Sequence, residues 1–242
     1  MPKLLQLNMW GGRLEKQIAD FVKREQPDIL CLQEAISYDQ EDTAMFLSIE
    51  NLQKFVGIEH AAIAPVFSFK LMNSTARFGN VILSRYPILK SEVIFTRLGH
   101  QDDFDFNEHD YNIRNFIHAV VSIDGQPVNI ITHHGHHVHA HKNGDEETMR
   151  QVGLLVDYVK ALEGPVIVTG DFNLHPKSES LDLLNKQLEN LSITHKLKTT
   201  RNNLTHKKEV CDYIFVNDAV QVKKFSMPEE VVSDHQALML EF

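Results

Sequence analysis

The segment VIVTGDFN, residues 166–173, carries an acid and an amide directly after an apolar, strand-like run. In an extended chain residues i and i+2 point to the same face, so Asp171 and Asn173 would project together while Phe172 turns into the core. Gly170 leaves room for a group to approach the backbone. A carboxylate and an amide side by side suit a hard metal ion, a water or a phosphoryl oxygen. An ordinary turn, which also uses Asp and Asn, is the alternative for this segment alone.

Polar residues also stand beside apolar runs elsewhere in the chain. They are Asn8 in LQLN, Glu34 in LCLQE, Asp212 in CDYIFV, and Asp234 and His235 in SDH. An unpaired charge beside a core strand is costly, so each could simply be a hydrogen-bonded residue at a sheet edge. Together they form a set rich in carboxylates, which favours Mg²⁺, with Mn²⁺ as the alternative, over Zn²⁺.

The elements that must position these residues alternate between strands and helices. Apolar runs predict strands at residues 3–7, 28–34, 210–217 and 235–242, one within 79–89 that ends at Pro87, and a hairpin over 114–134 around Asp124 and Gly125. Helical spacing predicts helices at residues 13–26, 42–55, 145–164 and 178–191. Residues 99–112 are acidic and aperiodic, which indicates a surface loop. Hairpins mixed with helical crossovers favour one α/β domain built as a layered sandwich of mixed sheets.

Composition describes an ordinary globular protein with an acidic balance. The 242 residues are 43% hydrophobic and carry a formal net charge of −9, which argues against a protein that mainly coats nucleic acid. Cys31 and Cys211 lie in apolar runs, as expected for buried free thiols in a reducing compartment. Apolar runs fall short of the roughly 20 residues that cross a bilayer, so we expect a soluble, cytoplasmic protein without a membrane anchor.

The motifs LQLN, LCLQE, RFGNVILSRYPI, ITHHG, VIVTGDFN, CDYIFV and VSDH occur in an order that resembles the endonuclease/exonuclease/phosphatase superfamily of DNase-like, metal-dependent phosphoesterases. The resemblance runs from Asn8 to His235, and GDFN followed by SDH is its most specific part. It implies an α/β (α+β) fold, a four-layer sandwich of two mixed β-sheets flanked by helices, with the site at one edge. It also implies a single catalytic domain over residues 1–242.

The resemblance assigns roles to the first group of polar residues. Glu34 would be the main metal ligand, assisted by Asn8 and Asp234. Asp171 would align or activate the attacking water, and Asn173 would hold a non-bridging phosphate oxygen. Such an apparatus is consistent with phosphoester hydrolysis, which needs an in-line water and neutralised phosphate oxygens.

Two histidines complete the implied catalytic set. His235, oriented by Asp212, would contact the phosphate and assist proton transfer, because a carboxylate behind an imidazole fixes its tautomer and raises its pKa. A further phosphate contact falls in IITHH, where we assign His134, with His133 as the near alternative. Adjacent residues of a strand point to opposite sides, so only one of the two would face the site.

The histidine-rich run at residues 133–141 has three interpretations. It contains His133, His134, His136, His137, His139 and His141. A zinc or nickel site is one hypothesis, since imidazole is a favoured ligand of both metals. The spacing matches no compact zinc motif, so one catalytic histidine followed by a solvated loop is favoured over it. A loop that binds anionic substrate at the rim of the site is the third interpretation.

Basic residues suggest where substrate phosphate could bind. Arg77 and Arg114 each flank a strand and are candidate substrate-binding residues, although surface arginines are common. Residues 195–208 are rich in Lys and Arg and contain no acid, and they precede CDYIFV, so they should lie near the site or form a charged surface loop. Trp10 could offer a stacking surface or serve in packing.

The leading hypothesis is therefore a Mg²⁺-dependent phosphoester hydrolase, specifically a phosphodiesterase or nuclease-like enzyme. The acidic balance favours short or single-stranded nucleic acid over long duplex as a substrate. The alternatives are a hydrolase of phospholipid, inositol-phosphate or sugar-phosphate headgroups, and a catalytically silent binding module on the same fold.

Overall fold

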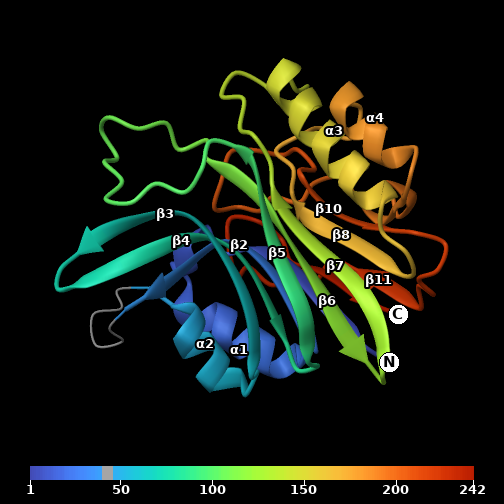
Figure 1. Ribbon diagram of the computed structural model, residues 1–242, viewed down its shortest axis with the longest axis horizontal. Coiled ribbons are helices and arrows are strands. Elements are labelled where there is room, and N and C mark those ends of the chain that lie inside the picture. Colours follow the sequence, from blue (N-terminus) through green and yellow to red (C-terminus); the bar gives the residue numbers. More distant parts are fainter. Residues whose placement is uncertain (40–45) are drawn as a thin grey trace.

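The described residues of the computed structural model, 1–39 and 46–242, form two β-sheets with helices outside them (Figure 1). The first sheet contains β1 (Lys3–Asn8), β2 (Ile29–Tyr38), β3 (His60–Leu71), β4 (Ser74–Ser84), β11 (Lys224–Ser226) and β12 (Leu238–Glu241). The second contains β5 (Ile88–Arg97), β6 (Arg114–Ile123), β7 (Gln126–His134), β8 (Val166–Asp171), β9 (Glu189–Asn190) and β10 (Asp212–Val216). The helices are η1 (Trp10–Gly12, a 3₁₀ turn), α1 (Glu15–Glu25), α2 (Ile49–Val56), α3 (Glu146–Lys160), α4 (Glu179–Asn185) and α5 (Leu191–Thr194).

Both sheets are mixed, which confirms the predicted fold class. The first has the strand order β11-β12-β1-β2-β4-β3 and the second β5-β6-β7-β8-β10-β9. The pairs β1–β2 and β7–β8 are parallel, and the other paired strands are antiparallel. A parallel pair needs a long crossover, and here α1 and α3 provide the two crossovers.

The core forms between the sheets and beneath the helices on either side. In β1, Leu4 packs into the cluster shared by the two sheets, whereas Leu5 and Leu7 pack with α1 and α2 on the outer face. In β8, Ile167 likewise faces the other sheet, while Val168 packs against α3 and α4. Side chains alternate between the faces of a strand, so strands buried on both faces read as continuous apolar runs.

The sheet topology brings the polar strand ends together. Because β7 and β8 are parallel and in register, His134 lies beside Asp171 at the carboxyl ends of both strands. The antiparallel strand β10 begins at the same edge and pairs Asp212 with Asp171. Asn8, at the carboxyl end of β1 in the other sheet, donates a hydrogen bond to Asp171 at 3.2 Å. Asn8, His134, Asp171 and Asp212 therefore lie together at one edge of the sandwich.

Two predicted helices differ from the structure. Residues 42–45 of the predicted helix 42–55 lie outside the described residues, and residues 46–48 are not helical. The helix begins only after Ser48, whose side chain accepts the Asn51 N–H as an N-cap. The predicted helix 178–191 is wrong in its second half, where α4 ends at Asn185 and β9 and α5 follow. There Asn190 accepts the Ile193 N–H and starts a new turn of helix.

Three strand assignments also need correction. The strand β2 does not end at Glu34, as predicted, but continues to Tyr38 past an irregularity in its pairing with β4. The strands β3 and β5 were not predicted. Pro65 interrupts the pattern of β3, and most of β5 is exposed at the edge of its sheet, so neither has the apolar signal of a buried strand.

Residues 99–112 do connect strands as a loop, but the loop is not purely a surface feature. Phe104 is buried, and its ring stacks on that of Phe67 in β3 with a centroid distance of 4.2 Å. Backbone hydrogen bonds between Gln101 and Val66, and between Phe104 and Ser68, attach the loop to the edge of β3. Acidic residues alternate with the aromatic ones in this segment, so its sequence predicted an exposed loop and not a partly buried one.

Candidate active site

A polar cavity of about 240 Å³ lies at the edge where the strand ends meet. Its walls combine residues from both sheets with residues from the loops beside them. The lining comprises Trp10, Glu34, Arg114, His134, His137, Asp171, Asn173, Arg201, Lys207, Asp234 and His235. Residues from the beginning, middle and end of the chain thus share one cavity.

Glu34 reaches this cavity because the backbone of β2 bulges. The register between β2 and β4 shifts between Leu32 and Ala35, and Glu34 itself adopts a positive φ of 50°. A bulge redirects a side chain that regular alternation would send elsewhere. The Glu34 carboxylate accepts a hydrogen bond from the Asn8 amide at 3.1 Å and lies 3.9 Å from the ring of His134.

The GDFN segment combines the two interpretations that its sequence allowed. Asp171 and Asn173 both line the cavity, and Phe172 between them is buried in the core. The Asp171 carboxylate also accepts the Asn173 N–H at 2.9 Å, so the segment forms an Asx turn as well. Gly170 has φ +146°, and a Cβ there would lie 1.9 Å from the His133 carbonyl oxygen. Glycine is therefore required where β8 meets β7.

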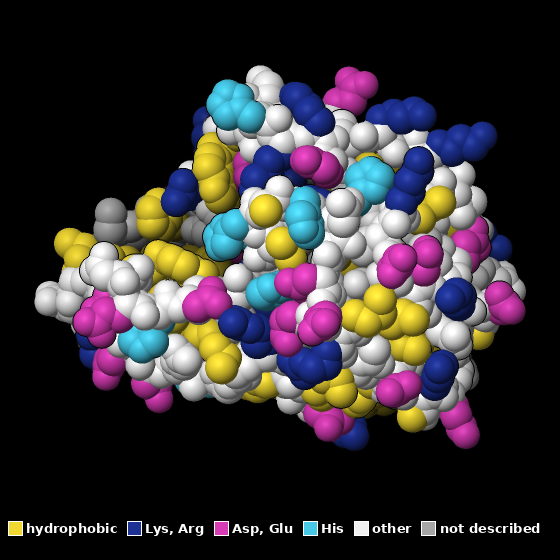
Figure 2. Space-filling view, turned by 90° about the horizontal axis from the view of Figure 1, so that it is seen from above, with side chains coloured by type: hydrophobic (Ala, Val, Ile, Leu, Met, Phe, Trp, Pro, Cys, Tyr) yellow, Lys and Arg dark blue, Asp and Glu magenta, His cyan; other side chains and the backbone are white. Residues whose placement is uncertain are grey.

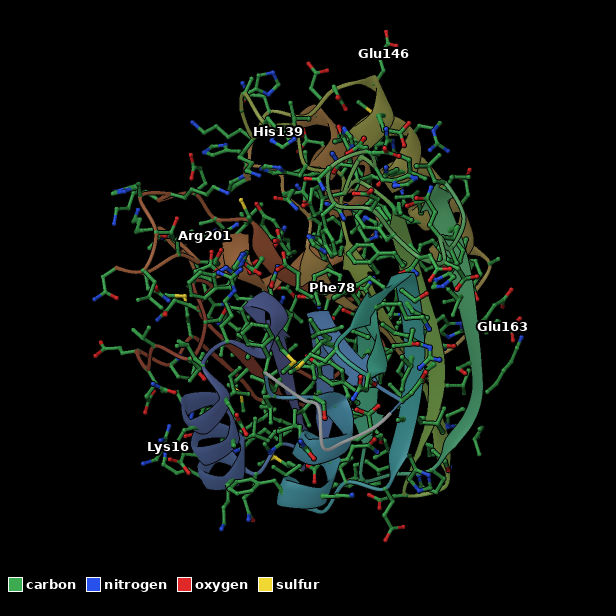
Figure 3. The ribbon with its side chains drawn as sticks, turned by 90° about the vertical axis from the view of Figure 1, so that its left-hand side faces the viewer. Lys16, Phe78, His139, Glu146, Glu163 and Arg201 are labelled. Atoms are coloured by element: carbon green, nitrogen blue, oxygen red, sulfur yellow. The ribbon has the colours of Figure 1, made fainter. Side chains whose placement is uncertain are left out.

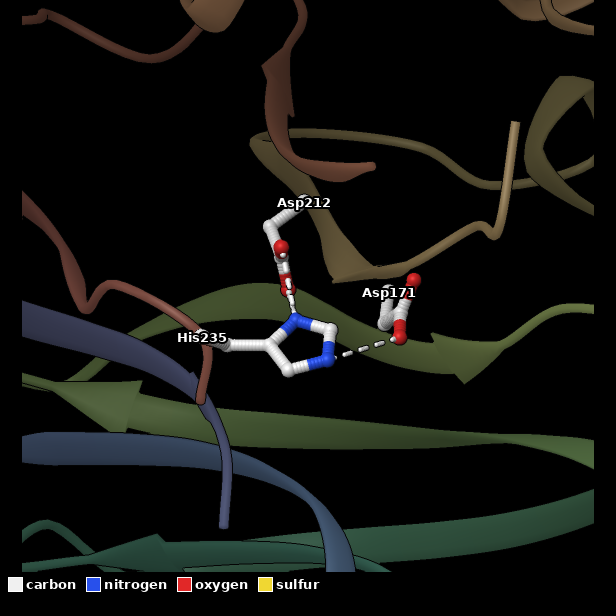
Figure 4. Close-up of side chains that lie close together, drawn as sticks. All are labelled: Asp171, Asp212 and His235. Atoms are coloured by element: carbon white, nitrogen blue, oxygen red, sulfur yellow. Dashed lines mark hydrogen bonds and ion pairs between the residues drawn. The ribbon is translucent and has the colours of Figure 1, made fainter. Parts of the chain in front are cut away.

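His235 is held between two buried carboxylates (Figure 4). Its Nδ1 lies 2.9 and 3.0 Å from the two oxygens of Asp212, and its Nε2 lies 3.6 Å from Asp171. Burial alone would lower the pKa of His235, but Asp212 and Asp171 raise it above its usual value. The ring can therefore present a proton or a positive charge to an anion in the cavity.

Burial would raise the pKa of Asp171, yet the surrounding cationic groups lower it far below the usual value. The largest of these effects come from His235 and Arg201, and Lys142 adds to them. Arg201 lies 3.9 Å from Asp171, and Lys142 donates a 2.6 Å hydrogen bond to the amide oxygen of Asn173. Asp171 is thus an anion and a weak base, suited to orienting a water molecule.

Sequence reasoning did not single out Arg201 or Lys142. Arg201 is almost fully buried, forms an ion pair with Asp234 at 3.2 Å and contacts Nε2 of His235. The basic segment 195–208 was expected near the site, and the structure brings Arg201 and Lys207 of this segment into the cavity. Lys142 directly follows the histidine-rich run, and its local sequence contains no motif that predicts a functional lysine.

The other candidate residues divide between the cavity and its surroundings. His134 lines the cavity, while His133 points into the core, where its ring lies 5.2 Å from that of Phe172. Arg114 also lines the cavity, but its guanidinium donates to nearby carbonyl oxygens, including that of Gly135 at 2.8 Å. The structure does not bring Arg77 to the cavity, because its side chain pairs with Asp39 on the surface.

The histidine run contributes to the cavity through His134 and His137. The ring of His136 lies 3.7 Å from Asp145, which caps α3. The rings of His137 and His139 pack edge to face, with centroids 4.7 Å apart. Among the described residues, these histidines do not join a cluster of metal-ligand type, as a zinc or nickel site would require.

The carboxylates of the cavity fit a divalent cation. Burial raises the pKa of Glu34 above its usual value. The Asn8 hydrogen bond and His235 oppose this rise, whereas Asp171 and Asp234 add to it. In the described part of the chain, no Lys or Arg forms an ion pair with Glu34, and burial holds the neighbouring His134 neutral by lowering its pKa. A hard cation would supply the charge that this oxygen-rich group lacks.

A second group of ligand-type atoms has another explanation. Asp171, Asp212 and His235 offer atoms within 4.8 Å of one another. The His235 ring stands between the two carboxylates, and its Nδ1 is already bound to Asp212. The hydrogen bond of His235 with Asp212 and its ion pair with Asp171 therefore account for the proximity of the three residues.

The molecule is thus an α/β sandwich with a carboxylate-rich cavity at one edge. The endonuclease/exonuclease/phosphatase family model matches residues 5–235, so the chain belongs to this family, whose members are phosphoesterases and nucleases. No curated protein sequence matches the chain significantly. Among the described residues, no helix is long and apolar enough to cross a membrane.

Three solved structures share this fold along nearly their whole length. An endonuclease/exonuclease/phosphatase from Bacteroides vulgatus superimposes with a TM-score of 0.72 at 18% identity, covering 99% of this chain and 97% of that one. The mannosyl-6-phosphatase of Bacteroides thetaiotaomicron gives 0.71 at 17% identity, covering 100% and 99%. The human Nocturnin catalytic domain with bound sulfate anion gives 0.68 at 16%, covering 99% and 92%. At such identities the likeness concerns the fold.

Proposed function

We propose that this chain is a Mg²⁺-dependent phosphoester hydrolase that acts on phosphodiesters in the manner of a nuclease. The observation that carries the proposal is the single cavity shared by Glu34, Asp171, Asn173, Asp234 and His235. It combines oxygen ligands for a hard cation with donors for a phosphate. Residues 1–242 would act as one catalytic domain, and the buried free cysteines support a cytoplasmic location.

The metal would be held by Glu34 and Asp234, with Asn8 fixing the Glu34 carboxylate through its amide. Bound Mg²⁺, or Mn²⁺ as the alternative, supplies neutralisation of phosphate oxygens and of the charge that develops on the leaving group. The Asn8 side-chain oxygen accepts the Trp10 N–H, which holds the amide in place. Asn8 would therefore assist chiefly by orienting Glu34.

The residues around Asp171 would bind the phosphate and orient the water. Asp171 is anionic and buried, so it would align the attacking water by accepting its hydrogen bond. Asn173 and His134 would contact non-bridging oxygens. His235 would donate to the phosphate from Nε2 while Asp212 holds Nδ1.

The cations at the cavity support an anionic substrate. Arg201 and Lys207 from the basic segment, together with Arg114, line its walls. The net charge of −9 opposes tight binding of long duplex, so short or single-stranded nucleic acid is the favoured polymer. Arg77 would bind substrate only if it reached beyond its ion pair with Asp39.

A substrate panel tests the proposal. Single-stranded DNA, RNA, abasic duplex, a sphingomyelin, an inositol phosphate and a sugar 6-phosphate would each be assayed with Mg²⁺, with Mn²⁺ and with EDTA. We expect metal-dependent turnover of a phosphodiester, lost in Glu34→Gln and His235→Ala and retained in the exposed control Glu15→Gln. Metal-independent turnover, or full activity of the two site variants, would contradict the proposal.

A further inference from the structure

A second cavity, of about 440 Å³, adjoins the polar one and shares Trp10, Glu34, Arg114 and His134 with it. Its remaining lining is mainly aromatic, and we call it the aromatic cavity. The aromatic residues that line it are Trp10, Phe46, Phe67, Phe69, Phe78, Phe106 and Tyr111. Phe78 of this cavity and Arg201 of the polar cavity are labelled in Figure 3.

Rings of this lining contact one another both face to face and edge to face. Phe67 stacks on Phe78 with centroids 5.1 Å apart and planes 9° apart. Phe106 meets Phe69 edge to face, with centroids 4.9 Å apart and planes at 83°. Stacked and edge-to-face pairs of this kind stabilise beyond the area that they bury. A further planar ring could add to the same arrangement.

The mouth of the aromatic cavity leaves large apolar groups in contact with solvent. Phe106 is 41% exposed and Tyr111 is 52% exposed, and both belong to the loop that covers the edge of β3. Figure 2 shows hydrophobic side chains beside histidine and basic side chains on one face of the molecule. Exposed apolar groups that adjoin a polar cavity are typical of ligand sites.

Two guanidinium groups distinguish this lining from a simple apolar pocket. The Arg13 guanidinium lies 4.7 Å from the centroid of the Trp10 ring, and both residues line the aromatic cavity. Arg114 is buried, and its pKa falls only to about 10, so it remains cationic. A hydrocarbon chain bound here would displace water from these cations, and it could not replace the hydrogen bonds that the water makes to them. An aromatic ring can instead present its π face to a cation.

We propose that the aromatic cavity binds an aromatic group, a nucleobase or an aryl ring, that is attached to the phosphate held in the polar cavity. The shared wall makes one ligand able to reach both cavities. The inference rests on the proposed function because it names the substrate class of the same site. Phosphoesters with an aromatic substituent are then the preferred substrates.

Binding of unreactive phosphonates tests the inference without turnover. Phenylphosphonate, cyclohexylphosphonate and methylphosphonate would be titrated by calorimetry with Mg²⁺ present, and thymidine 5′-phosphonate would serve as the nucleobase ligand. Trp10 is the single tryptophan and lines both cavities, so its fluorescence reports binding at this place. We expect the phenyl and thymidine ligands to bind at least about tenfold more tightly than the cyclohexyl and methyl ligands, a difference of about 1.4 kcal/mol.

Equal binding of phenyl- and cyclohexylphosphonate would overturn the inference, as would equal binding of phenyl- and methylphosphonate or no binding at all. Failure of the proposed function has a different signature, since it is the absence of metal-dependent hydrolysis across the substrate panel. An aryl preference without hydrolysis would therefore support the inference and oppose the proposed function.

Variants at the mouth locate the binding. Phe106→Ala and Tyr111→Ala remove exposed rings, so we expect folded proteins that bind phenylphosphonate about tenfold more weakly and methylphosphonate unchanged. The matched control is Phe55→Ala, because Phe55 is 47% exposed on α2 and does not line this cavity. Wild-type affinity for phenylphosphonate in both mouth variants would overturn the inference.

Discussion

Both carboxylate oxygens of Asp212 lie within hydrogen-bonding distance of Nδ1 of His235, at 3.0 and 2.9 Å. The carboxylate is fully buried and also accepts from Thr200 Oγ1 at 2.6 Å and from Gln6 Nε2 at 3.3 Å. The ring therefore cannot rotate without breaking a network that spans both sheets. Its Nε2 is directed into the polar cavity, beside Asp171.

Replacing Asp212 with asparagine should lower kcat on a confirmed phosphodiester by roughly 100-fold or more, the usual size of a general acid–base contribution. The amide keeps the shape of the side chain but carries no negative charge to stabilise a protonated ring, and its NH₂ group can donate to Nδ1 and favour the wrong tautomer. Steady-state kinetics would measure the loss, with the exposed Asp218→Asn as the control. An unchanged kcat would show that His235 needs no orientation by Asp212.

Replacing Glu34 with glutamine should separate stability from metal binding. The substitution removes a half-buried charge that Asp171 and Asp234 repel, so the metal-free protein should keep its melting temperature or gain slightly. Wild-type protein should be stabilised by about 3 kcal/mol when Mg²⁺ exceeds its Kd a hundredfold, and the variant should lose this gain. Thermal melts with and without Mg²⁺ measure both effects. The same Mg²⁺-dependent gain in both proteins would contradict the role of Glu34.

Alanine at Gly170 should destabilise the fold by about 2–4 kcal/mol, because the new Cβ would meet the His133 carbonyl oxygen in the neighbouring strand. Neither strand can move without disturbing Asp171, so activity should fall as well. Gly153 in α3 is the matched control, since a Cβ there meets nothing within 4 Å. There alanine should stabilise by up to about 1 kcal/mol. Urea unfolding of both variants checks the contrast, and equal stabilities would refute it.

The buried His133 should make the protein less stable in acid. Burial lowers the pKa of its ring from 6.5 to about 4, so the unfolded chain binds a proton before the folded chain does. Stability from this group is complete above pH 6.5 and falls between pH 6.5 and about 4, by about 3 kcal/mol at most. His133→Asn should flatten the dependence of unfolding free energy on pH in that window. An identical slope in the variant would contradict the prediction.

Local sequence pattern identified most elements that are buried on one or both faces. The continuous apolar runs of β1, β8 and β10 and the apolar stripes of α1 and α3 are visible because burial demands such residues. The local sequence pattern did not predict elements whose packing depends on residues distant in the chain. The edge strand β5 needs few apolar residues, and the leucines of residues 178–191 serve two short helices and a strand.

The polar motifs supplied candidates for the site, but their geometry depended on long-range contacts. GDFN placed Asp171 and Asn173 together through a spacing of two residues. The bulge that turns Glu34 toward the cavity arises from its pairing with β4 and has no local signature. The sequence does not distinguish Arg201 from the other basic residues of its loop, whereas the structure shows its contacts with Asp234 and His235.

The order of motifs along the chain was sufficient to indicate the family, the layered fold and the carboxylate-rich chemistry, because hydrophobic alternation and short turns are encoded locally. Only the tertiary structure decided which histidine faces the cavity, which cations surround Asp171, and that a wall of aromatic rings adjoins the polar cavity. These features arise where β3, β4 and the loops of distant segments meet. Contacts between residues so far apart in the chain produce no periodic pattern in the sequence.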